Sequence, residues 1–129
     1  MKGFGLLLCL VLFSCAETNR EEHVQNLPQD KIVYEDGMKT VFFENSESIR
    51  FRGEVNKDSL WNGRVTAFNR DGTIQSTSNY TNGLKYGNHQ VFYSNGSLRY
   101  TGEFRNDTMI GKWIFYDQNG NFEREKDYY

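Results

Sequence analysis

The chain has 129 residues with 17 acidic and 15 basic side chains, which gives a formal net charge of −2. This length fits one domain plus a terminal segment. The composition argues against a nucleic-acid binder, because such proteins carry an excess of Lys and Arg that neutralises phosphates.

The first fifteen residues predict an export signal. Lys2 supplies a positive charge and the run from Phe4 to Phe13 is apolar, but a membrane-spanning helix needs about 20 apolar residues. The sequence Leu12-Phe13-Ser14-Cys15 resembles the bacterial lipobox. This resemblance implies removal of residues 1–14 as a signal peptide and attachment of acyl chains, such as palmitate, to Cys15. The alternative is an ordinary signal peptide followed by a chance cysteine.

Residues 15–30 predict a flexible tether that begins at the lipidated cysteine. The segment is polar and aperiodic, and it holds the chain's single proline, Pro28. His23 has no cysteine or second histidine nearby, so no metal site is predicted there. We therefore expect a lipoprotein of the bacterial cell envelope, anchored in a membrane through Cys15, in the outer membrane rather than the inner one.

Residues 31–129 contain an internal repeat of about 24 residues, a feature that must be recognised before a fold is assigned. Two glycine series and one aromatic series share this period. A degenerate earlier copy spans Asp36 to Val55, so the domain has three clear copies and one degenerate copy. The repeated positions are Gly63, Gly87 and Gly111; Gly72, Gly96 and Gly120; and Phe68, Phe92 and Tyr116.

Each copy predicts a β-hairpin. Alternation of side chains around Trp113 and Phe115 is typical of a strand. Asn95-Gly96 lies between two such runs and predicts a tight turn, because Gly and, to a lesser degree, Asn tolerate a positive φ. Gly72 and Gly120 are the equivalent turn glycines. A further segment, residues 57–62 in the first copy and residues 106–110 in the last, is predicted to connect to the next hairpin. The predicted fold is all-β, an elongated antiparallel sheet of stacked hairpins.

The spacing of these glycines, aromatics and Asn-Gly turns resembles the MORN-variant repeat over residues 31–129. The resemblance implies hairpins laid side by side in an elongated, twisted antiparallel sheet. Some relatives are antitoxin-like and others are membrane-associated or assembly scaffolds, so it implies a non-catalytic scaffold for a protein partner. An antitoxin-like role stays open, although the export signal weighs against a cytoplasmic antitoxin.

The sequence contains no known catalytic signature. His89 occupies the repeat position of Val65 and Trp113, which favours a side chain that fills the inner face over a catalytic base. An enzyme acting on envelope polymers through paired carboxylates is the rival hypothesis, but the repeats offer no such pair at matched positions. We therefore predict no enzyme activity, no cofactor and no metal.

Phe68, Phe92 and Tyr116 form a candidate binding stripe, because equivalent positions in stacked hairpins lie in a row on one face. One interpretation is a platform for a glycan, a peptide or the apolar surface of a partner. The other is cross-strand aromatic packing, in which each pair contributes about 0.2–1 kcal/mol. A glycan-binding module therefore remains an alternative to the protein scaffold.

Overall fold

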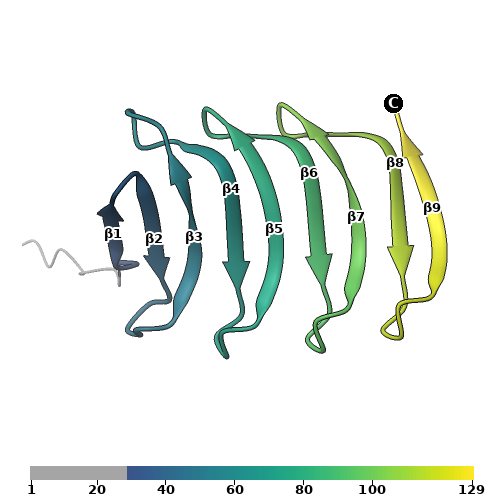
Figure 1. Cartoon of the computed structure of the whole chain (residues 1–129), viewed down its shortest axis with the longest axis horizontal. Helices are drawn as coiled ribbons and strands as arrows, with labels where there is room; N and C mark the ends of the chain where they lie inside the picture. Colours follow the sequence, from purple (N-terminus) through teal and green to yellow (C-terminus); the bar gives the residue numbers. More distant parts are fainter. Residues whose placement is uncertain (1–28) are drawn as a thin grey trace, which may run out of the picture.

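The computed structural model describes residues 29–129 as one open sheet (Figure 1). The predicted signal peptide, Cys15 and most of the tether lie outside the described residues. Residues 29–129 form nine strands and no helix. The strands are β1 (Ile32–Glu35), β2 (Met38–Phe42), β3 (Ile49–Val55), β4 (Trp61–Phe68), β5 (Ile74–Thr81), β6 (Leu84–Phe92), β7 (Leu98–Arg105), β8 (Thr108–Tyr116) and β9 (Phe122–Tyr128).

Each strand pairs antiparallel with the next, so the order of strands in the sheet is their order in the chain. The predicted all-β sheet of consecutive hairpins is therefore confirmed. The strands lie side by side in a long row, with β1 at one edge and β9 at the other (Figure 1). Within residues 29–129 no second layer covers either face. Burial of a side chain therefore depends on its neighbours in the same sheet.

Five-residue turns of one geometry connect β4 to β5, β6 to β7 and β8 to β9, at the lower side of Figure 1. In the β6–β7 turn, the Gly96 N–H donates to the Tyr93 carbonyl at 2.9 Å and the Tyr93 N–H donates to the Ser97 carbonyl at 2.8 Å. Gly96 has a φ of 88°, and the equivalent Gly72 and Gly120 both have 85°. A left-handed glycine therefore completes each of these turns.

Two-residue turns close three hairpins at the opposite side of the sheet. They are Asp36-Gly37, Asn82-Gly83 and Asn106-Asp107, and both residues of each turn have a positive φ. This is the type I′ geometry, whose twist matches that of paired strands. The predicted connecting segment at residues 106–110 is wrong, because the chain reverses within two residues and β8 already begins at Thr108. Between β3 and β4 a connecting segment does exist, at residues 56–60 against the predicted 57–62.

A register shift recurs just before each five-residue turn. It precedes the pairs Phe68↔Ile74, Phe92↔Leu98 and Tyr116↔Phe122, which follow one another at steps of 24 residues in the sequence. One extra residue on the second strand produces each shift, as in a β-bulge. The backbone therefore repeats with the period predicted from the glycines.

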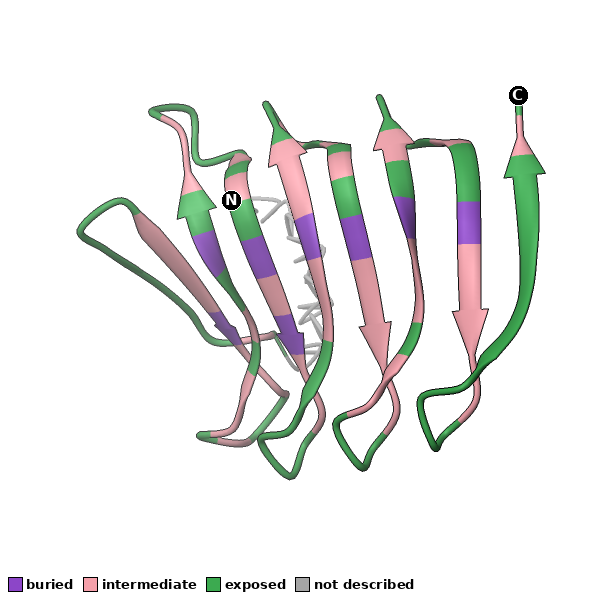
Figure 2. Ribbon diagram, turned by 45° about the vertical axis from the view of Figure 1, so that its right-hand side comes forward, coloured by how far each residue is buried: buried purple, intermediate pink, exposed green. Residues whose placement is uncertain are grey.

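The buried side chains lie on one face of the sheet, which we call the core face; the opposite face is the outer face. Val65 pairs directly with Ser78, and Ser78 pairs directly with His89. Directly paired residues point to the same face. Figure 2 shows the buried residues as a band across the middle of the strands. The buried side chains are Val41, Val65, Ala67, Ser78, His89 and Trp113.

At the centre of this band, a small residue on one strand accommodates a larger residue on the next. Gly53 lies opposite Val65, and Ser78 lies opposite His89. Gly102 lies against Trp113, since a Cβ added to Gly102 would overlap the indole ring. Trp113 is only 1% exposed, so an open sheet of one layer buries even its largest side chain.

Candidate functional site

The C-terminal half of the core face carries a continuous cluster of aromatic rings, which we call the aromatic cluster. Trp113 is at its centre and lies edge-to-face with Phe104, with ring centroids 5.2 Å apart. His89 lies edge-to-face with Phe104 at 5.3 Å, and Tyr100 contacts Phe115 at 5.5 Å. These separations are in the favourable range for aromatic pairs. The cluster comprises His89, Tyr100, Phe104, Trp113, Phe115 and Tyr128.

Three cations lie over the rim of this cluster. The Arg124 guanidinium is 3.7 Å from the centre of the Phe115 ring. Lys85 lies 4.9 Å from the Phe104 ring and Lys126 lies 4.7 Å from the Tyr128 ring. Each distance permits a cation–π interaction, worth about 0.5–1 kcal/mol at an exposed site. Together with the rings, Lys85 and Arg124 line an open groove of about 420 Å³ on the core face.

Cations over aromatic rings extend along the rest of the core face. Lys39 lies 5.0 Å from the Trp61 ring, and Arg99 lies 5.5 Å from the Tyr93 ring. The three ion pairs among residues 29–129 involve other cations, namely Lys31, Arg50 and Lys112. Six cations over aromatic rings, which we call the free cations, therefore have no carboxylate partner in the described part of the chain. The free cations are Lys39, Arg70, Lys85, Arg99, Arg124 and Lys126.

His89 is a buried, neutral member of the aromatic cluster. It is 7% exposed, and its Nδ1 lies 2.7 Å from the Ser78 hydroxyl. Burial, with a smaller contribution from the nearby Lys85 charge, lowers the pKa of His89 from 6.5 to about 4. The Ser78–His89 pair superficially resembles a nucleophile with its base. Both side chains are buried, however, so a substrate has no access to the hydroxyl.

The stripe predicted at Phe68, Phe92 and Tyr116 lies on the outer face, on the side of the five-residue turns. The bulge pairs these residues with Ile74, Leu98 and Phe122, respectively. All three stripe residues are half-buried. The ring–ring contacts of residues 29–129 do not include the stripe and lie on the core face instead.

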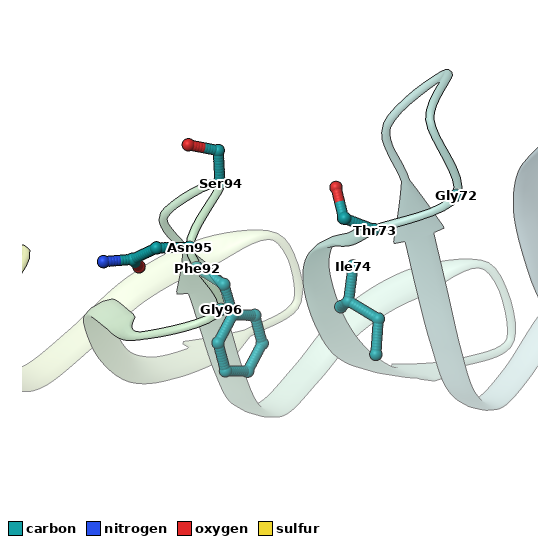
Figure 3. Close-up of a pocket in the computed structure, with 7 residues that line it drawn as sticks. All are labelled: Gly72, Thr73, Ile74, Phe92, Ser94, Asn95 and Gly96. Atoms are coloured by element: carbon teal, nitrogen blue, oxygen red, sulfur yellow. The ribbon is translucent and has the colours of Figure 1, made fainter.

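A groove of about 400 Å³ lies between two neighbouring hairpins along this stripe. Ile74 and Phe92 form its apolar walls, and Figure 3 shows both side chains extending to the same side of the sheet with a gap between them. The turns at Gly72-Thr73 and Ser94–Gly96 form its upper rim. The stripe is thus an interrupted row of apolar side chains with polar turns beside it.

Other kinds of site find no support in the described residues. Residues 29–129 hold no group of three His, Cys, Asp or Glu side chains placed to bind a metal ion. None of their elements is a helix of the length and apolarity that crossing a bilayer requires. Cys15, the predicted lipidation site, lies outside the described residues.

No known protein family and no curated protein matches the sequence. Among solved structures, the chain is similar to part of the crystal structure of the GtfA/B complex bound to UDP and GlcNAc. The likeness covers 78% of this chain and 24% of the other, with 14% sequence identity and a TM-score of 0.36. The chain thus spans about a quarter of that protein's length. At this TM-score the likeness carries no argument about function.

Proposed function

We propose that this protein is a non-catalytic interaction scaffold of the bacterial cell envelope, built from MORN-like repeats and anchored through acylated Cys15. The observation that carries the proposal is the core face itself. Six cations without an ion pair in residues 29–129 lie over aromatic rings on a surface that no second layer of these residues covers. Such a surface is suited to recognition, and a fold alone does not supply an activity.

The chemistry of the core face selects an acidic partner. A carboxylate that approaches Arg124 or Lys126 finds a cation without a competing ion pair in residues 29–129. The rings beneath the cations can bury apolar side chains that flank the carboxylate. Aromatic and Arg side chains dominate the energy of many protein interfaces. An acidic segment of a protein that also carries apolar residues is therefore the partner that fits best.

The position of the reactive groups supports a non-catalytic role. Among residues 29–129, His89 is the single histidine. Its hydrogen bond with Ser78 and its contacts with aromatic rings make it part of the core. A pKa of about 4 leaves His89 neutral near neutral pH. His89 is only 7% exposed, so a packing role accounts for it.

A glycan-binding role is the second candidate, and the groove between Ile74 and Phe92 is the observation that favours it. The groove places one aromatic ring beside polar turns, and sugars combine apolar faces with hydroxyl groups. This site lies on the outer face, whereas the free cations lie on the core face. Substitutions can therefore separate the two candidates.

The test compares three baits in a quantitative pull-down from solubilised envelope. They are the wild-type chain, an Arg124→Glu/Lys126→Glu variant and an Arg64→Glu/Arg105→Glu variant, whose changes lie on the outer face and alter the net charge equally. We expect a partner that binds the wild type and the outer-face variant but is lost from the core-face variant and released by salt. Equal binding to all three baits would contradict a core-face scaffold. Binding that survives both charge reversals but fails in Phe92→Ala would assign function to the stripe.

The anchor has a test of its own. Metabolic labelling with a fatty acid should mark the wild-type chain, and Cys15→Ala should remove the label, because Cys15 is the predicted acylation site. Several acyl chains make membrane release negligible, since each buried methylene adds about 0.8 kcal/mol. An unlabelled wild-type chain, or a mature N-terminus at another residue, would refute the lipoprotein assignment.

A further inference from the structure

The two edges of the sheet expose different chemistry. Edge strands are usually protected from pairing with other chains by charged residues. Strand β9 follows this rule, since five of its seven residues are charged. Strand β1 does not, because Ile32, Val33 and Tyr34 are 47%, 38% and 52% exposed. Among residues 29–129, the β1 edge is thus an apolar strand with no partner on its second side.

The hydrogen-bonding groups of β1 show which residues are available at its free side. The Lys31 carbonyl accepts a bond from the Phe42 N–H at 2.9 Å, so Lys31 faces β2. In an antiparallel pair, successive residues point their N–H and C=O groups to alternate sides. Val33 and Glu35 therefore also face β2, and the backbone groups of Ile32 and Tyr34 point away from the sheet.

We propose that β1 pairs antiparallel with β1 of a second copy of this chain, about a two-fold axis at Val33. In this register Ile32 of each copy lies opposite Tyr34 of the other, and their outward backbone groups form four hydrogen bonds. Val33 lies opposite Val33, and Lys31 lies opposite Glu35. The two nine-stranded sheets then continue as one sheet, with both core faces on the same side.

Charge complementarity selects this register. A two-fold axis perpendicular to the sheet keeps like faces together, so the pairing shifts only in steps of two residues. The neighbouring registers set Val33 opposite either Lys31 or Glu35 and leave the other charge without its partner. Lys31 already contacts Glu47 at 2.8 Å in one copy. Exposed ion pairs contribute little energy, so the apolar residues supply the affinity. The Lys31–Glu35 contact distinguishes this register from its neighbours.

The opposite edge excludes a second copy by the same reasoning. On β9, Lys126 pairs with the core-face residue Trp113, and Asp127 pairs with Lys112 on the outer face. From Arg124 to Asp127, the alternation places basic residues on the core face and acidic residues on the outer face. Two-fold pairings of β9 with itself about Glu125 or Lys126 therefore set like charges against each other on both faces, which is destabilising. Self-association through β1 therefore closes as a dimer.

Disulfide trapping tests the dimer. Because Val33 faces β2 within its own copy, Val33 and its counterpart form a non-hydrogen-bonded pair, in which the Cα atoms lie about 4.5 Å apart. This separation is within the range of about 4.4–6.8 Å that a disulfide spans. We expect Val33→Cys in the full-length chain to form a covalent dimer in oxidised glutathione at least tenfold faster than Glu125→Cys on β9. The wild-type chain reports the background from its own cysteines, and equal rates for the two variants would overturn the proposal.

A charge exchange tests the register independently of the apolar contact. In the Val33→Cys background, Lys31→Glu or Glu35→Lys alone sets like charges opposite each other and should slow dimer formation several-fold. The double variant Lys31→Glu/Glu35→Lys should restore the original rate. Circular dichroism confirms that each exposed substitution leaves the sheet folded. A double variant as slow as the single variants would show that the two strands do not pair in this register.

Discussion

The two halves of the core face use the same backbone geometry with different side chains. In the N-terminal half Gly53 lies opposite Val65, and in the C-terminal half Gly102 lies against Trp113. A Cβ on Gly53 would lie 2.7 Å from both the Arg64 carbonyl oxygen and the Val65 Cγ2 and 2.8 Å from the Val65 Cα, whereas the three atoms nearest to a Cβ on Gly102 all belong to the indole ring. The N-terminal glycine is therefore required mainly by the close approach of two backbones, and the C-terminal glycine by the size of one side chain.

This difference also distributes burial unevenly along the sheet. Val65 and Ala67 are the buried side chains of β4, and both are small. In the C-terminal half, six rings including Trp113 form one network of contacts. Apolar burial stabilises a fold by about 25 cal/mol per Å². The larger rings should make the C-terminal half the more stable one, and they also form the surface beneath Arg124.

The largest predicted effect is the loss of the central ring. Trp113→Ala should destabilise the protein by about 3–5 kcal/mol, as removal of a buried Trp does. Val65→Ala at the matched position should cost roughly 1.5 kcal/mol, because it removes two carbons at about 0.8 kcal/mol each. Urea unfolding of both variants measures the difference. Equal losses would show that the aromatic cluster adds nothing to the stability of the C-terminal half.

The Ser78–His89 pair, which lies between these two halves, should make the stability of the fold depend on pH. Because burial lowers the pKa of His89 to about 4, the unfolded chain takes up a proton near pH 6.5 while the folded protein does not. Stability should therefore fall as pH decreases from 6.5 to about 4, by roughly 3 kcal/mol, and level off below that.

The control for this prediction replaces the Ser78–His89 pair with the residues of the equivalent N-terminal pair, Gly53 and Val65. Ser78→Gly/His89→Val recreates the arrangement of Gly53 and Val65 and removes the titrating group. Urea midpoints between pH 4 and pH 6.5 should change much less in this variant than in the wild type. An identical pH dependence in both proteins would mean that other groups cause it.

The repeat period was sufficient to predict the sheet and one of its faces. Glycines and aromatics at steps of 24 fixed the hairpins, and the shared position of Val65, His89 and Trp113 indicated an inward-facing row that the structure shows to be buried. The turn at Asn82-Gly83 was equally visible as a dipeptide signal. It was missed because a connecting segment had been assumed between hairpins, at the side where the chain in fact reverses in two residues.

The candidate site was harder to predict, because it depends on register. Tyr100 and Phe115 are 15 positions apart in the sequence and meet only because β7 pairs with β8 in one register. Arg124 reaches Phe115 through the next pairing, between β8 and β9. The stripe at Phe92 was visible in the sequence as aromatic residues that recur at steps of 24. Its position on the face opposite the aromatic cluster follows from the alternation along β6, where Val91 and Phe92 point to opposite faces.

The smallest predicted effect tests most directly whether the two glycines are needed for different reasons. Gly102→Ala should destabilise by about 1–3 kcal/mol, the usual cost of overpacking, because its Cβ meets the Trp113 ring. Adding Trp113→Val should remove that overlap, so the double variant should be no less stable than Trp113→Val alone. Gly53→Ala should be rescued only in small part by Val65→Ala, which removes the Val65 Cγ2 but leaves the Arg64 carbonyl and the Val65 Cα in place. Two urea double-mutant cycles measure these couplings. A large coupling at Gly102–Trp113 with a much smaller one at Gly53–Val65 is expected, and equal couplings would show that side-chain size explains both glycines.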